Sequence, residues 1–200
     1  MAGIFYFLVV ISISNILLDK LPQDYDGYLI RTDFGIGIQI TLCATDSSLS
    51  EYERAAIMIN LLYGRGMPDL ETSMKGLHWF MSCGKEQTEE GSDNSPAAMS
   101  FDFDDARIYS AFKRIFSVDL SKDRLHWFQF ISMLQDIEGS ALSEIIGYRT
   151  ADLSKMKGEE RAAYAKMQRR FALPDTYTEE EQTVINDFLA QLNQSNVIEP

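Results

Sequence analysis

Every histidine and tryptophan of this chain lies within one tetrapeptide, LHWF, which occurs at residues 77–80 and again at 125–128. An imidazole can bind a metal or act as a general base beside a nucleophile. Together with Cys43 and Cys83, His78 and His126 make four good soft ligands, the number that a tetrahedral zinc site requires. The repeat therefore raises three alternatives: a metal site, a duplicated active site or aromatic packing.

The spacing of these residues argues against chemistry. His78 and Cys83 are five residues apart and would point about 140° away from each other on a helix, whereas helical zinc motifs use i, i+3 or i, i+4 spacing. A nucleophilic cysteine beside His126 would need a third residue to orient the ring, and no pattern indicates one. The GIGIQI stretch at 35–40 lacks the third glycine of a dinucleotide site. We therefore predict that the chain is not an enzyme, with no catalytic residue, no metal and no cofactor.

The flanks of the two copies differ. On a helix, His78 shares a stripe with Glu71 and Lys75, so we expect it to face solvent while Leu77 and Met81 face the core. The first copy of the tetrapeptide would then be incidental. His126 lies at the margin of a narrow polar arc on an apolar helix, where we expect a hydrogen-bonded core histidine. The expected structural core is Leu125, Trp127, Phe128, Phe130, Ile108 and Phe112.

Composition favours one globular domain. The chain has 200 residues, of which 46% are hydrophobic and 12% aromatic, enough for a sizeable core. Its two cysteines form no CxxC pair, which is typical of a reducing, cytoplasmic setting. The net charge of -12 disfavours binding to nucleic acid or to an anionic membrane, since both require Lys and Arg.

The charge is unevenly distributed. Residues 149–170 contain seven basic and three acidic side chains, a balance of +4, so the rest of the chain carries -16. This polarity could steer a partner of the opposite pattern, or the basic stretch could be a solvated helix face.

The N-terminus is apolar, since residues 1–18 carry no charge. No Lys or Arg precedes the run, no cleavage site follows it, and a membrane span needs about 20 apolar residues, so a signal peptide or anchor is disfavoured.

We divide the chain into an apolar extension at 1–16, a single helical domain at 17–193 with a flexible acidic loop at 85–100, and a tail at 194–200.

Residues 33–42 are ambiguous. Alternating apolar residues favour a strand, while Thr32 as a cap and an i, i+4 stripe favour a helix. Gly35 and Gly37 would each destabilise a helix by about 1 kcal/mol, so the local sequence slightly favours the strand.

The rest of the chain has helical periodicity. Ser50, Asp102 and Ser121 are the expected caps of three helices, the last of them central. A helix within 154–173 should turn Ala163, Met167 and Phe171 inward. Thr178 begins the final helix, whose apolar stripe is Val184, Phe188 and Leu192. The predicted fold is mainly α: a compact single-domain bundle of about seven helices with a short extended N-terminal segment.

Several motifs resemble those of the phage family called "gp fifteen", encoded in the tail modules of siphophages and prophages. They are TDF at 32–34, the run 102–112, DL at 119–120, LHWF with Phe130, and YR at 148–149. The resemblance covers residues 17–192. It implies a helix at 33–42, whereas the local pattern favours a strand. Residues 1–14 lie outside the family pattern, which is what translation from an upstream start codon would produce.

The resemblance implies a tail assembly chaperone of the host cytoplasm that binds the tape-measure protein and the tail-tube protein, with a homo-oligomer also allowed. The surfaces expected to bind a partner are the basic face of Lys166, Arg169 and Arg170 and the terminal stripe of Val184, Phe188 and Leu192. A structural tail or head-tail connector component is the alternative. A membrane-anchored prophage protein is a third interpretation, which rests on residues 1–18 alone.

Overall fold

The computed structural model describes residues 20–85 and 98–174. The apolar extension, most of the acidic loop, and the terminal stripe of Val184, Phe188 and Leu192 therefore lie outside the described residues. Within the described ranges the fold is mainly α, with seven α-helices and one small two-stranded sheet. None of the helices in these ranges is long and apolar enough to cross a membrane.

The first elements are a short hairpin and a helix. Strand β1 (Asp24–Tyr25) pairs antiparallel with β2 (Tyr28–Leu29) around a turn at Asp26 and Gly27, both of which have positive φ. Helix α1 (Phe34–Ala44) follows, and the Asp33 carboxylate caps it by accepting from the Gly35 N–H at 2.9 Å. The helix that the family resemblance implied is confirmed. The locally favoured strand is wrong, and the cap is Asp33 rather than Thr32.

Gly37 explains why the local pattern favoured a strand at 33–42 although the segment is a helix. It is buried against the Trp127 ring, and a Cβ built on it would lie 2.1 Å from Trp127 Cε3. The glycine is therefore required by close packing between two helices, and its penalty in an isolated helix is outweighed by the burial of the indole.

Helices α2 (Glu51–Tyr63) and α3 (Leu70–Met81) complete the first half, with the short 3₁₀ helix η1 (Gly64–Gly66) between them. Ser50 and Glu53 form a capping box at the start of α2, as the predicted Ser50 cap requires. Helix α2 packs on both α1 and α3.

The second half contains α4 (Asp105–Phe116) and α5 (Trp127–Gln135). The predicted Ser121 cap is wrong because α5 begins only at Trp127. The Phe34 N–H donates to the Leu125 carbonyl at 3.0 Å, and the Trp127 N–H donates to the Thr32 carbonyl at 2.7 Å. These two bonds hold the segment before α5 extended beside the segment before α1, so a helix cannot start there.

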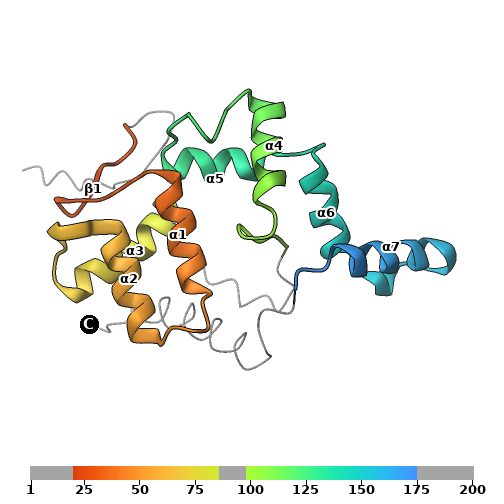
Figure 1. Cartoon of the computed structure of the whole chain (residues 1–200), viewed down its shortest axis with the longest axis horizontal. Helices are drawn as coiled ribbons and strands as arrows, with labels where there is room; N and C mark the ends of the chain where they lie inside the picture. Colours follow the sequence, from red (N-terminus) through yellow and green to blue (C-terminus); the bar gives the residue numbers. More distant parts are fainter. Residues whose placement is uncertain (1–19, 86–97, 175–200) are drawn as a thin grey trace, which may run out of the picture.

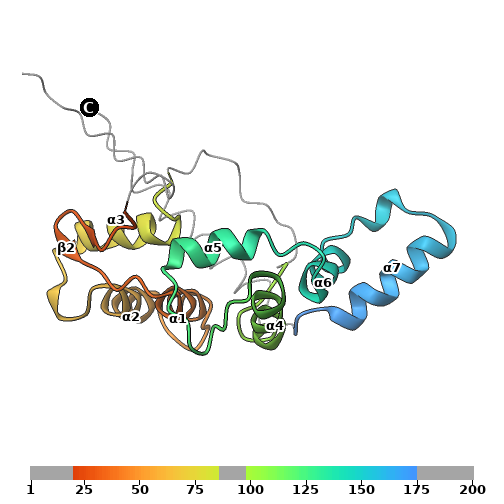
Figure 2. The same ribbon diagram turned by 90° about the horizontal axis from the view of Figure 1, so that it is seen from above.

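The helices of the body form two layers. Seen from above, α3 and α5 lie over α1, α2 and α4 (Figure 2). Phe130 of α5 is fully buried between the layers and stacks on Phe34 of α1 at 5.1 Å and on Phe112 of α4 at 5.0 Å between ring centroids. Among the expected core residues, Leu125 is only partly buried and the other five are buried.

Helices α6 (Ala141–Arg149) and α7 (Gly158–Phe171) extend from this body, with the 3₁₀ helix η2 (Leu153–Lys155) between them. Helix α7 projects away from the body along the long axis of the molecule (Figure 1). No residue of α7 is buried, and Ala163, which we expected to point inward, is exposed, because α7 packs mainly on α6 and η2.

A buried ion pair ties α4, α6 and α7 together. The Asp104 carboxylate accepts from Arg149 Nη1 at 2.6 Å and from Nη2 at 3.1 Å, and Arg149 Nε donates to the Phe171 carbonyl at 2.7 Å. Burial raises the pKa of Asp104, but the hydrogen bonds and charges around it, with Arg149 foremost, prevail and hold the pKa below its ordinary value. Because its carboxylate serves this pair, Asp104 makes no side-chain cap to α4, and the predicted Asp102 cap is wrong.

Replacing Gly37 tests the helix contact. Gly37→Ala should lower the free energy of unfolding by about 1 to 3 kcal/mol, because the added methyl group overlaps the Trp127 ring. The matched control is Gly147→Ala in α6, where an added Cβ meets nothing within 4 Å and should stabilise the protein by about 0.4 to 1 kcal/mol. Urea unfolding measures both. Equal effects at the two positions would contradict the close contact.

Candidate partner-binding site

The two LHWF copies meet in the core. The Phe80 ring of the first copy lies 6.2 Å from Trp127 and 6.1 Å from Phe128 of the second, and Trp79 lies 5.6 Å from Phe128. Leu77 and Phe80 are buried, so the apolar residues of the first copy lie in the core, as expected, and they share it with the second copy. His78 is partly exposed at the edge of this cluster.

His126 uses both ring nitrogens on the backbone. Its Nδ1 accepts from the Phe128 N–H at 3.1 Å and caps α5, while Nε2 lies 2.9 Å from the Pro22 carbonyl. An acceptor at Nδ1 and a donor at Nε2 define the neutral Nε2–H tautomer. Burial lowers the pKa of His126, which keeps it in that form. The expected hydrogen-bonded core histidine is confirmed, and neither nitrogen is available to bind a metal or to activate a thiol.

The two thiols are poor nucleophiles. Burial raises the pKa of Cys83 to about 11, and burial together with the charge of Asp46 raises the pKa of Cys43. Both therefore stay protonated at neutral pH, whereas the thiolate is the reactive form. The described residues contain no group of three His, Cys, Asp or Glu side chains able to hold a metal ion.

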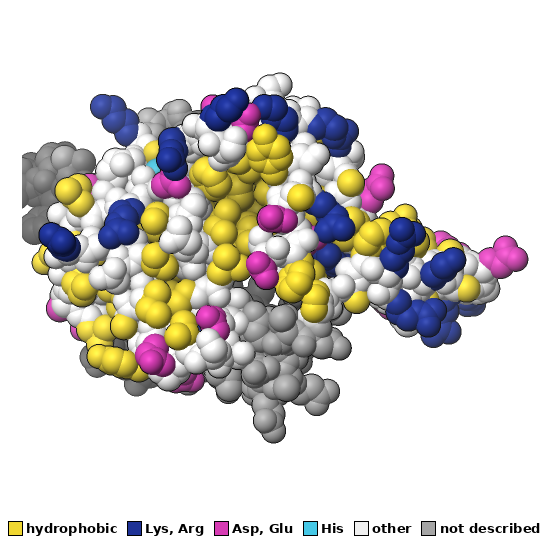
Figure 3. Space-filling model, viewed as in Figure 1, with side chains coloured by type: hydrophobic (Ala, Val, Ile, Leu, Met, Phe, Trp, Pro, Cys, Tyr) yellow, Lys and Arg dark blue, Asp and Glu magenta, His cyan; other side chains and the backbone are white. Residues whose placement is uncertain are grey.

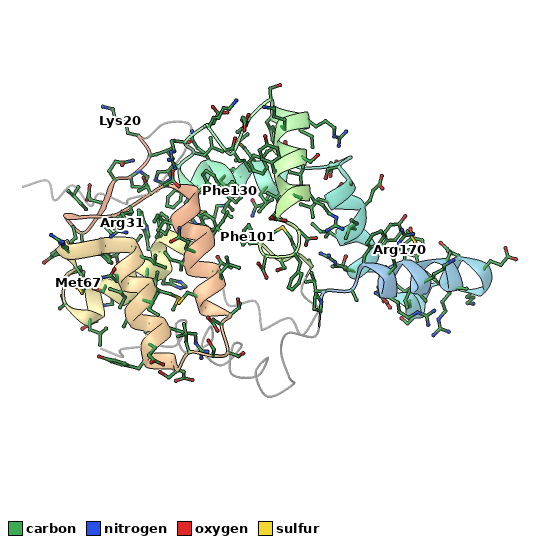
Figure 4. The ribbon with its side chains drawn as sticks, viewed as in Figure 1. Lys20, Arg31, Met67, Phe101, Phe130 and Arg170 are labelled. Carbon is green, nitrogen blue, oxygen red and sulfur yellow. The ribbon has the colours of Figure 1, made fainter. Side chains whose placement is uncertain are left out.

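An apolar groove lies between α1 and α4. It has a volume of about 500 Å³ and is lined by Ile38, Phe101, Asp105, Ala106, Ile108, Tyr109, Leu120, Ser121 and Phe130. Figure 3 shows hydrophobic side chains gathered in a hollow band between these helices. Phe101 and Phe130 lie together in this region, while Arg170 lies apart on α7 (Figure 4).

The floor of the groove belongs to the protein core. Phe130 and Ile108 are buried, and Phe130 packs on Phe101 with 6.1 Å between ring centroids. Ile38 and Phe101 are partly buried, and Tyr109 is 39% exposed. The same aromatic cluster that holds α1, α4 and α5 together thus fixes the shape of the groove.

A polar network holds the outer wall. The Asp119 carboxylate accepts from Lys113 Nζ at 2.6 Å, from Ser121 Oγ at 2.6 Å and from the Tyr109 hydroxyl at 3.1 Å. The bond from Lys113, followed by that from Ser121, holds the pKa of Asp119 well below its ordinary value. The carboxylate is therefore ionised at neutral pH, and it holds Tyr109 beside Leu120 and Ser121, all three of which line the groove.

This arrangement suits an apolar ligand. Asp105 is the one titratable carboxylate in the lining, and most of the other contacts are aliphatic or aromatic. Grooves of this kind accept the apolar face of an amphipathic helix, with anchors at i, i+3 or i+4, and i+7.

The predicted basic face lies outside the groove, and the predicted terminal stripe lies outside the described residues. Lys166, Arg169 and Arg170 are exposed on α7 and do not line the groove. The groove was not predicted, because its lining comes from four separate segments. One signal could have found it: the motifs at 102–112 and 119–120, together with Phe130, carried the family resemblance and supply most of the lining.

Comparison with known proteins gives one match. The model of the family described as "Bacteriophage Gp15 protein" matches residues 17–173, which is more than half of the chain. This range contains the groove and α7 and ends before the predicted terminal stripe. No curated protein and no solved structure matches the chain.

The cap made by His126 should make stability depend on pH. Protonation puts a hydrogen on Nδ1, which then cannot accept from the Phe128 N–H. Because burial lowers the folded pKa below the ordinary value of about 6.5, the stabilisation is complete above that pH and is lost as the pH falls through the folded pKa. Urea unfolding between pH 5 and 8, as rough limits, measures this loss.

Two variants isolate the source of that dependence. His126→Asn keeps an acceptor for the cap but has no titrating ring, so the decline in this range should disappear. His78→Gln removes the partly exposed histidine and should leave the decline unchanged. A decline that follows His78 instead would contradict the assignment.

Proposed function

We propose that this chain, which belongs to the Bacteriophage Gp15 protein family, acts without enzymatic activity as a tail assembly chaperone. In this proposal it binds the tape-measure protein in the host cytoplasm and assists tail-tube assembly. The observation that carries the proposal is the apolar groove between α1 and α4.

The physical requirement is protection of an apolar helix. A tape-measure protein is a long chain with apolar helical faces, which aggregate if they stay exposed to water. A groove of about 500 Å³ can take a few apolar side chains from one such face. Burial of each large aliphatic side chain contributes roughly 1.5 to 3 kcal/mol, so a few anchors give reversible binding, as a chaperone needs.

Selectivity would come from the rim. Tyr109 offers an aromatic face beside the groove while its hydroxyl is held by Asp119. Asp105 places a negative charge at the edge, which favours a helix with a basic residue beside its apolar stripe and disfavours an acidic one.

The alternative function is a structural tail or head-tail connector component. The observation that favours it is α7, which projects from the body as an assembly element would (Figure 1). Mass spectrometry of purified virions separates the two functions: a chaperone should be absent from the particle, and a structural component should be abundant in it.

A charge placed in the groove tests the proposal. When the tape-measure protein is co-expressed with the wild-type chain, its soluble fraction should rise. Ala106→Glu should abolish this gain and weaken binding at least tenfold, about 1.4 kcal/mol, because the carboxylate would be desolvated against apolar side chains. Ala106 is exposed on α4 and Glu is a good helix former, so the fold should persist.

The matched control is Ser110→Glu, an exposed position on the same helix that does not line the groove. It should solubilise the tape-measure protein as the wild type does. The proposal fails if Ala106→Glu behaves like this control. It also fails if the tape-measure protein is equally soluble when expressed alone.

A further inference from the structure

Helix α7 carries an exposed basic face. Its exposed Arg161, Lys166, Arg169 and Arg170 form no ion pair with any residue of the described ranges. Aromatic groups accompany these charges: Tyr164 and Phe171 pack on Tyr148 and stay partly exposed. We call Gly158–Phe171 with these side chains the basic arm.

The opposite pattern occurs on the far side of the body. Asp46, Glu51 and Glu53 are exposed around the start of α2, and three large hydrophobic side chains of α1 and α2 are exposed as well. Those residues are Tyr52 at 83% exposure, Ile57 at 39% and Leu42 at 38%. Figure 3 shows acidic and hydrophobic side chains together over the lower ends of α1 and α2, and Lys and Arg over α7. We call this surface the acidic apolar patch.

The charges of the patch are available to a partner. Hydrogen bonds from Ser48 and Ser50 lower the pKa of Asp46 and Glu53, respectively, so both are ionised at neutral pH. Arg54 is the nearby basic residue, and it is buried, with its Nη1 donating to the carbonyls of Asp46 and Leu49. The charge of Arg54 contributes to the lowered pKa of Asp46, but Arg54 forms no ion pair with Asp46, Glu51 or Glu53.

The arm and the patch cannot meet within one molecule. Both views place α7 at one end of the long axis and α2 at the other (Figures 1 and 2). A second copy can bring them together, since each copy offers one arm and one patch. We propose that the basic arm of one copy docks on the acidic apolar patch of the next, so that the chain associates head to tail.

Charge and apolar surface both support this occupant. The arm carries four basic and two acidic side chains, a balance of +2, while the rest of the chain carries -14, so a second copy has the complementary field for the arm. Exposed apolar patches beside such charges mark protein interaction sites. A contact between two different surfaces leaves an arm and a patch free at the ends, so association continues with concentration instead of stopping at a dimer. The inference does not depend on what occupies the groove.

Sedimentation velocity of the full chain tests the contact. At low salt the weight-average mass should rise with protein concentration, and about 1 M salt should shift this rise at least tenfold higher in concentration, because the screening length falls to about 3 Å. Lys166→Glu with Arg170→Glu reverses the arm, and Ser47→Lys with Glu51→Lys reverses the patch. Each pair alone should remain monomeric, and circular dichroism should show an unchanged helix content.

Rescue gives the decisive comparison. A chain carrying both reversed surfaces, or an equimolar mixture of the two variants, should associate again at low salt. Lys20→Glu with Arg65→Glu is the control, since it changes the net charge by the same amount as arm reversal at exposed sites outside the arm. A monomeric wild type, a control that dissociates like the arm variant, or a failure of rescue would each overturn the proposal.

Discussion

The fit of the Trp127 ring on Gly37 is the contact on which the rest of the structure depends. Because residue 37 has no side chain, the indole lies directly on the backbone of α1. Trp127 also stacks on Phe130, with 5.8 Å between ring centroids, and Phe130 in turn packs on α4. A displaced indole would move Phe130, and with it the floor of the groove. The groove is therefore the outer edge of the aromatic core.

The ion pair of Asp104 and Arg149 has a different consequence. It fixes the start of α4 to the end of α6, and through the Phe171 carbonyl to the end of α7. Breaking such a buried pair typically costs about 3 to 5 kcal/mol, because one charge is left without a partner. Asp105 and Ala106 of the groove directly follow Asp104 in the chain. The pair thus sets the position of the groove wall and the base of the basic arm at once.

Local patterns predicted much of the fold. The cap at Ser50, and the burial of Trp127, Phe128 and Phe130, follow from nearest-neighbour chemistry and helical periodicity. The start of α5 could not be found in this way, because residues 125–127 are held extended by hydrogen bonds to residues far away in the sequence. The strand that the local pattern favoured at 33–42 was wrong for a similar reason. Gly37 packs on Trp127, which is far away in the sequence.

The site was harder to predict than the fold. The contact between the two LHWF copies depends on how α3 meets α5, and a helical stripe describes only one helix at a time. Charge counting did find the basic arm, since electrostatic asymmetry is a property of the sequence itself. The groove combines four segments that share no sequence period, so the family resemblance was its one indirect signal.

Hydrogen exchange of the full chain, alone and with the tape-measure protein, tests the central claim most directly. At high salt, binding in the groove should slow exchange of the backbone amides at 101–109 and 118–122. The amides of α7 should change little in the same complex. Protection confined to α7, or no protection at 101–109 despite complex formation, would contradict the assignment of the groove as the partner-binding site.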